Sequence, residues 1–163
     1  MTAANTGKQA VLEAVIAQVE SKLVEMRAGF DAARDAVLST PHVMKGKREV
    51  FGQESAYLAN ALSLNIHERE HEVKILQNLH LPDKPERVFL GCLVGVGPAD
   101  GLPSAIYLLL PVCGGMEIPV PSGAAVRVIT PGTPIAKALL GRLLGDEVRL
   151  PNLPEPQRIR LLQ

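Results

Sequence analysis

A run of apolar and small residues, spaced alternately four and three positions apart, dominates the first quarter of the sequence. Its members are Leu12, Ile16, Val19, Leu23, Met26, Phe30, Ala33 and Val37. This spacing is the heptad seam of a helix that pairs with another helix. Because no proline occurs between Lys8 and Pro41, about 30 residues can form one helix of about 45 Å that ends at Pro41.

A second helical pattern of matching length begins near Phe51. It continues through Leu58, Leu62, Ile66, Val73 and Leu76, with Arg69 at the intervening seam position. Because only about ten residues, Gly46 among them, separate the two patterns, the helices can bury their seams by folding back on each other. We therefore expect a long antiparallel coiled-coil hairpin with its tip at residues 40–52, preceded by a loose terminus over residues 1–9.

The sequence after Leu81 is rich in proline, which excludes a further long helix. Short segments that are β-branched or rich in leucine, and bounded by Gly or Pro, are typical of strands. They cover residues 88–96, 105–110, 125–130, 147–150 and 158–162. The sequence thus predicts an α+β fold, with a helical hairpin domain over residues 1–81 and a small β-rich domain over residues 82–163.

One helix interrupts the predicted strands, over residues 134–144. Thr133 is its expected N-cap, Pro134 its first residue and Gly145 the residue just past its end. Four apolar residues fall on one side of this helix and are expected to pack on the sheet. They are Ile135, Leu139, Leu140 and Leu143.

The composition excludes several classes of function. The 17 basic residues balance the 17 acidic ones, so no overall basic field drives autonomous DNA binding. Aromatic residues are only 3%, which argues against base stacking on RNA. No apolar stretch has the length of a membrane span, and the polar start lacks the regions of a secretory signal. Cys92 and Cys113 are too few for a disulfide framework or a zinc cage and are expected to be buried thiols in a cytoplasmic protein.

The segment His67-Glu68-Arg69-Glu70-His71 matches the H-E-x-x-H pattern of zinc proteases. It falls on the second coiled-coil helix, where Glu and His are equally typical of a solvated face. The only later histidine, His80, lies about 13 Å farther along the same helix and cannot supply a third ligand. We therefore reject a zinc site at His67, Glu68 and His71.

Two segments of the second half carry the most specific pattern of the chain. They are Arg87-Val88-Phe89-Leu90-Gly91-Cys92-Leu93-Val94 and residues 128–148, which begin Val128-Ile129-Thr130-Pro131-Gly132-Thr133-Pro134-Ile135 and end Gly145-Asp146-Glu147-Val148. These segments resemble the FKBP-like C-terminal domain of the bacterial Gre-type (GreA/GreB) transcription elongation factors. That domain has a V-x-F-G strand and an S-P-I-x-x-A-L-I-G-x-x-x-G-D-x-V helix and strand. With the helical hairpin, the resemblance covers nearly the whole chain in the family's domain order.

The resemblance implies a monomeric binding protein, not an enzyme, that regulates transcription elongation. In Gre factors the C-terminal domain docks at the rim of the RNA polymerase secondary channel, and the hairpin passes down the channel toward the catalytic centre. The docking residues of this chain would be Thr133, Pro134, Ile135 and Lys137. A helix of about 45 Å is long enough for this reach, and nucleic acid would be met only through the polymerase complex.

The tip departs from the family pattern. Cleavage by Gre factors depends on two carboxylates in a D-L-x-E-N-A-E-Y segment, which help to hold a second Mg²⁺ of the polymerase. The acids available here are Glu49 and Glu54, five residues apart, beside the basic residues Lys45, Lys47 and Arg48. Positive neighbours compete for carboxylates and repel a cation. We expect no resident cofactor and weak or no stimulation of cleavage.

The basic cluster at the tip has two interpretations, contact with RNA or phosphate inside the channel and an ordinary charged loop.

Two alternatives to the polymerase function also stay open. An FKBP-like domain suggests a peptidyl-prolyl isomerase, but that chemistry uses an aromatic-lined pocket, and Phe89 and Tyr107 are the only aromatic residues after residue 81. The other alternative is a generic coiled-coil interaction module, because exposed heptads also associate.

Overall fold

The computed structural model divides the chain into two compact units. The sheet unit comprises Met1–Ile16 and Ile75–Gln163, and the stem unit comprises Ala17–Lys74. The backbone is described for residues 3–39, 45–121, 125–151 and 153–163, and the side chains for residues 7–35, 57–121, 125–151 and 153–163. These units differ from a division after residue 81, because the start of the first helix and the last residues of the second belong with the sheet.

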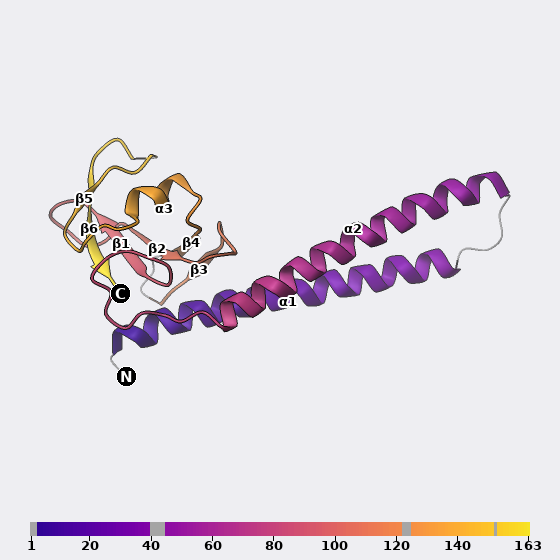
Figure 1. The fold of residues 1–163 in the computed structure, drawn as a ribbon, viewed down its shortest axis with the longest axis horizontal. Helices are drawn as coiled ribbons and strands as arrows, with labels where there is room; N and C mark the ends of the chain where they lie inside the picture. The colour runs from indigo at the N-terminus through magenta and orange to yellow at the C-terminus, as the bar shows by residue number, and fades with distance from the viewer. Residues whose placement is uncertain (1–2, 40–44, 122–124, 152) are drawn as a thin grey trace. The chain divides into compact units, whose positions relative to one another are not determined.

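Two long helices, α1 (Ala3–Ser39) and α2 (Lys45–Gln77), form the expected antiparallel pair (Figure 1). The expectation of a loose terminus is wrong for residues 3–9, which are helical. Helix α2 begins six residues before Phe51 and includes Gly46, which we expected in the connection. A glycine inside a helix costs only about 1 kcal/mol, and the Lys, Arg and Glu residues that follow it favour the helix.

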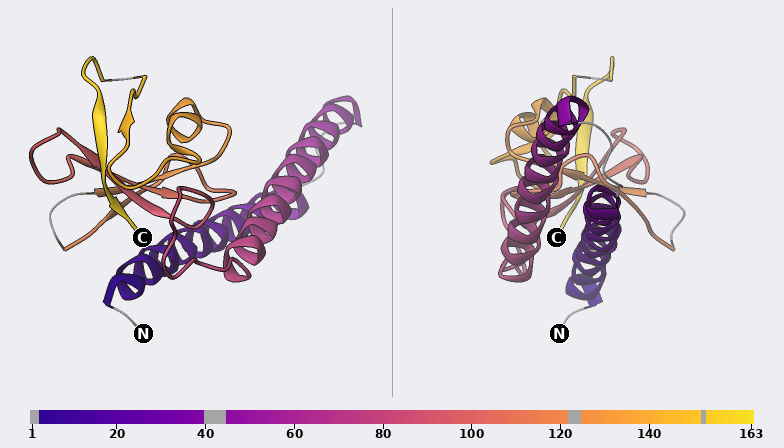
Figure 2. Two further views of the ribbon diagram at one scale, coloured as in Figure 1. Left: turned by 60° about the vertical axis from the view of Figure 1, so that its left-hand side comes forward. Right: turned by 90° about the vertical axis from the view of Figure 1, so that its right-hand side faces the viewer.

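The apolar seam of the stem unit is buried along only part of its length. Val19 and Leu23 on α1, and Ile66 and Val73 on α2, are buried. Leu58, nearer the start of α2, is 55% exposed. The two helices are seen from two further directions in Figure 2. On α2 the seam is therefore buried at Val73 and Ile66 and exposed at Leu58.

The sheet unit contains a six-stranded mixed sheet in the order β3-β4-β2-β1-β6-β5. The strands are β1 (Leu93–Gly97), β2 (Ala105–Leu109), β3 (Glu117–Pro119), β4 (Ala125–Ile129), β5 (Glu147–Val148) and β6 (Gln157–Leu162). Strands β2 and β4 pair in parallel, and the other named pairs are antiparallel. The α+β prediction is confirmed. Strand β3 was not predicted, because three residues that end in a proline show little of a strand pattern.

The strand expected over residues 88–96 is wrong in its first half. Strand β1 begins only at Leu93, and the chain turns at Gly91, whose φ is +83°. A Cβ at Gly91 would also lie 3.0 Å from Cδ of Pro82. Glycine is favoured at both a positive φ and a close approach of this kind, so the chain turns here and cannot continue as a strand.

Helix α3 (Pro134–Leu139) is shorter than predicted. Thr133 is its N-cap and Pro134 its first residue, as expected. The helix ends five residues before position 144, because Gly141 already has a φ of +78°. Leu139 is fully buried, whereas Leu143 is 43% exposed. The expected packing of Leu143 on the sheet is therefore wrong.

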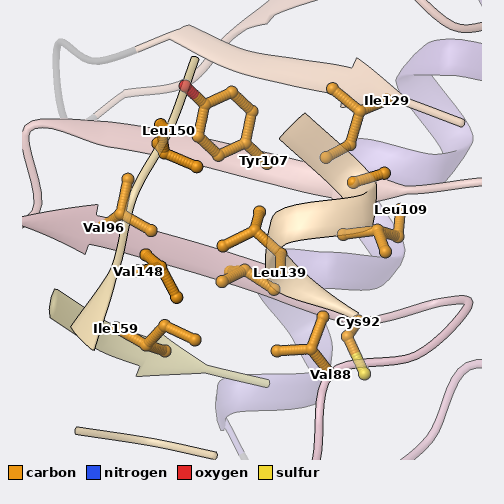
Figure 3. Packing of buried hydrophobic residues seen from close by; sticks show 12 residues of the cluster. Val88, Cys92, Val96, Tyr107, Leu109, Ile129, Leu139, Val148, Leu150 and Ile159 are labelled. Atoms are coloured by element: carbon orange, nitrogen blue, oxygen red, sulfur yellow. The ribbon is translucent and has the colours of Figure 1, made fainter. Parts of the chain in front are cut away.

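The core of the sheet unit lies between the sheet and α3. Figure 3 shows Val96, Tyr107, Leu109 and Ile129 of the strands gathered around Leu139. The other buried members of this cluster are Val88, Cys92, Val94, Ala136, Val148, Leu150 and Ile159. Cys92 and Cys113 are both buried, as predicted. Over the described residues, no helix combines the length and hydropathy that crossing a membrane requires.

Candidate functional site

The residues predicted for the tip lie in the first turns of α2. They are Lys45, Lys47, Arg48, Glu49 and Glu54. Their side chains lie outside the described residues. The helical backbone separates Glu49 and Glu54 by about 7.5 Å along the axis. The expectation that the basic neighbours of these two carboxylates disfavour a shared Mg²⁺ therefore stays a prediction.

Thr133 organises the residues predicted for docking. Its hydroxyl donates to the carbonyl of Thr130 at 2.8 Å and accepts from the backbone N–H of Ala136 at 3.3 Å. The second bond satisfies one of the N–H groups that every helix leaves unpaired at its start. The two bonds together hold the exposed Pro134 at the beginning of α3.

An open hollow of about 240 Å³ lies beside this capped turn. It is lined by Gly115, Arg127, Val128, Ile129, Thr133, Pro134, Ile135 and Pro151. Three of the four predicted docking residues are thus neighbours around one concave surface. The fourth, Lys137, is exposed on α3 and does not line the hollow.

Arg127 of β4 is a lining residue that we did not predict. Its Nε and Nη2 donate to Oε1 of Glu117 on β3 at 2.9 and 2.6 Å. This contact raises the pKa of the Arg127 guanidinium above its ordinary value. Because both side chains are about half exposed, the pair contributes little to stability but orients the guanidinium. The sequence signal was a single arginine between Val126 and Val128, which marks the outer face of a strand.

The hollow has no aromatic lining. Tyr107 is packed in the core of the sheet unit (Figure 3). Phe89 is 45% exposed, and neither ring lines the hollow. The aromatic pocket on which the isomerase alternative depends is therefore not found at this surface.

The H-E-x-x-H segment forms a contact network on the stem. Nδ1 of His67 lies 3.3 Å from Oε2 of Glu70, and Arg27 of α1 donates to the other carboxylate oxygen. The hydrogen bond from Arg27, and then the one from His67, lower the pKa of Glu70. Glu68 and His71 are exposed. In the part of the chain whose side chains are described, no three His, Cys, Asp or Glu residues are grouped to hold a metal ion.

Comparisons with known proteins find similar solved structures, among them three structures of Gfh1. No protein-family model matches the chain, and no curated protein matches it in sequence. GreA factor homolog 1 (Gfh1) of Thermus thermophilus is 18% identical, with a TM-score of 0.34, over 91% of this chain and 94% of that one. A structure of the transcription factor Gfh1 is 19% identical, with a TM-score of 0.39, over 91% and 92%. Gfh1 of Thermus aquaticus is 15% identical, with a TM-score of 0.36, over 93% and 95%. Likenesses at this level establish no shared activity.

Proposed function

We propose that this chain is a regulator of transcription that binds RNA polymerase and acts through its secondary channel. The observation that carries the proposal is a direct pairing of the two segments that resemble Gre factors. Val88 N–H donates to the carbonyl of Arg142, and Gly141 N–H donates to the carbonyl of Val88, both at 2.8 Å. Arg87 and Leu143 form an antiparallel bridge next to them. Each segment resembles the family separately, so their pairing supports one Gre-like domain.

The helices support the reach that this function needs. Within the stem unit, α1 contributes residues 17–39 and α2 residues 45–74, which correspond to about 35 and 45 Å. The sheet unit would dock through Thr133, Pro134, Ile135 and Lys137. The hollow next to Thr133 would receive a side chain of the polymerase, and Lys137 would meet an acidic group at its margin.

In this proposal the chain is a binding protein with weak or no stimulation of transcript cleavage. The basic residues Lys45, Lys47 and Arg48 stand next to the only acids near the start of α2. Such neighbours disfavour a shared cation at Glu49 and Glu54. Any Mg²⁺ would be the polymerase's own, held jointly with these carboxylates.

The first experiment measures binding of the full chain to bacterial core RNA polymerase. We expect a complex at micromolar concentration, and a Kd at least about fivefold higher for Lys137→Glu, since reversing a rim charge removes attraction and adds repulsion. Lys84→Glu is the matched control, because Lys84 is also an exposed lysine of the sheet unit. Absence of a wild-type complex at this concentration contradicts the proposal.

The second experiment measures RNA cleavage in backtracked polymerase complexes. We expect the wild type and the Glu49→Ala/Glu54→Ala double variant to give similar, low rates. Strong cleavage by the wild type that disappears in the double variant would assign the chain a Gre-type cleavage function instead.

A helical interaction module is the second candidate, favoured by exposed apolar side chains on the stem unit. Val24 is 67%, Tyr57 80%, Leu58 55% and Leu64 66% exposed. Apolar helix faces of this kind associate with other helices. A molar mass in solution of twice the 17.5 kDa chain mass, with no polymerase binding, would favour this candidate.

A further inference from the structure

Arg127 lies where the apolar core of the sheet unit ends. Side chains two positions apart on a strand share a face, so Arg127 and Ile129 lie on one face of β4. Ile129 is buried in the core cluster, whereas the side chain of Arg127 is 51% exposed. Both residues line the hollow beside Thr133. Arg127 therefore places a positive charge at the margin of an apolar surface.

Glu117 holds one side of the Arg127 guanidinium. The two residues lie opposite each other in the pairing of β3 with β4. One carboxylate oxygen of Glu117 accepts from both Nε and Nη2 of Arg127. A guanidinium carries five N–H donors, and these two contacts use neither hydrogen of Nη1 and only one of Nη2. The end of the guanidinium that carries Nη1 and Nη2 can therefore bind a second carboxylate through two parallel hydrogen bonds.

The hollow suits one side chain of a protein partner better than a small molecule. Its volume of about 240 Å³ is below the range of about 300–1,000 Å³ that is typical of small-molecule sites. None of its lining residues is acidic. Its apolar lining residues are Val128, Ile129, Pro134, Ile135 and Pro151. Such a surface favours an aliphatic side chain, and Arg127 at its margin favours a carboxylate beside that side chain.

We propose that the hollow recognises a segment of RNA polymerase in which an aliphatic residue stands next to an Asp or Glu. The aliphatic side chain enters the hollow, and the carboxylate binds the free end of the Arg127 guanidinium. Arg127 is then a specificity-determining residue, and Glu117 is a positioning residue that orients it before the partner binds. Donors that are already oriented reduce the ordering cost of binding. This inference rests on the proposed function.

The rate at which the full chain dissociates from bacterial core RNA polymerase tests the role of Arg127. Arg127→Lys keeps the positive charge and loses the planar pair of donors. Because loss of a hydrogen-bonded charge contact acts mainly on dissociation, we expect a dissociation rate about tenfold faster. A merely nearby positive charge would be replaced by lysine without this effect.

Arg158→Lys is the matched control for Arg127→Lys. Arg158 is an exposed arginine of β6 that lies opposite Glu147 of the edge strand β5, as Arg127 lies opposite Glu117 of the edge strand β3. It is at the other end of the sheet and does not line the hollow. Arg158→Lys should therefore leave the dissociation rate unchanged.

A second pair of variants tests the aliphatic part of the recognition. Ile135→Ala removes apolar contact area from the hollow, so the Kd for core polymerase should rise about fivefold. Leu144→Ala should leave the Kd unchanged, because Leu144 is 60% exposed and does not line the hollow. Thermal unfolding of each variant verifies that the chain is folded at the temperature of the binding measurement.

Two results would overturn this recognition while the proposed function stands. One is a complex from which Arg127→Lys dissociates at the wild-type rate, because charge alone would then suffice at this position. The other is a wild-type Kd for Ile135→Ala, because the partner would then leave the hollow unfilled. Absence of any wild-type complex would contradict the proposed function itself, and the recognition with it.

Discussion

Arg27 of α1 donates a hydrogen bond to the carboxylate of Glu70 on α2 and so joins the two helices of the stem unit. His67 lies 3.3 Å from the second oxygen of the same carboxylate. The side chain of Arg27 is 57% exposed and that of Glu70 29%. An ion pair this open to solvent selects the alignment of the helices more than it stabilises them.

We predict a small, pH-dependent loss of stability in Glu70→Gln. The hydrogen bond from Arg27, and then His67, lower the pKa of Glu70 from 4.5. The stabilisation is therefore complete above the unfolded pKa and is lost as the pH falls through the lower folded pKa. The Tm of the variant should lie slightly below that of the wild type at about pH 7, and the gap should close by about pH 2. Glu68→Gln, at an exposed position of the same helix, is the control and should have the Tm of the wild type. A difference in Tm between Glu70→Gln and the wild type that persists at about pH 2 would contradict this account.

Leu139→Ala should destabilise the sheet unit by about 2–5 kcal/mol, because Leu139 is fully buried at the end of α3. Leu143→Ala should cost less than about 1 kcal/mol, because Leu143 is 43% exposed. Chemical denaturation of the two variants measures the difference. Equal losses would mean that the helix extends through residue 143, as its sequence suggests.

Gly141→Ala should cost about 1–2 kcal/mol, because φ at this position is +78° and an L-residue is strained there. Nothing lies within 4 Å of the added Cβ, so the cost comes from the backbone alone. Gly132→Ala is the control, because its Cβ also meets nothing and its φ is not positive. Equal denaturation midpoints for the two variants would exclude the strain.

The free energy of unfolding of the wild type should rise as the pH rises toward 10.5, because of the lowered pKa of Lys8. Its pKa is lowered from 10.5 by burial, so over this window the unfolded chain binds a proton that the folded chain does not. Stability therefore rises with pH between the lowered folded pKa and the unfolded one. Cys92 and Asp83 act on the pKa of Lys8 in the opposite direction, and burial outweighs them. The Tm of Lys8→Met should exceed that of the wild type at about pH 7, and the difference should shrink by about pH 10. A difference that stays constant over this range would contradict a lowered pKa of Lys8.

The long helices were predictable because their signal is local. A heptad seam and the lack of proline favour helix at every turn of α1, and the helix ends at Ser39, shortly before Pro41. The N-cap at Thr133 was predictable for the same reason, since a cap needs only the cap residue and the turn that follows it. The start of α2 was missed because Gly46 signals a loop, although its helical cost is small.

Contacts between distant segments decided what the sequence did not. Val88 bonds to the backbone of Gly141 and Arg142, and this pairing accompanies both the late start of β1 and the early end of α3. Arg127 came to line a hollow with Thr133 only through the order of the strands. The sequence placed Lys8 in a loose terminus, whereas in the tertiary structure it is buried and bonds to the carbonyl of Pro82. Periodicity and capping depend on residues that are neighbours in the sequence, so the sequence by itself determined which helices and strands form. Burial depends on which distant segments meet. The tertiary structure therefore decided where these elements end and which side chains are enclosed.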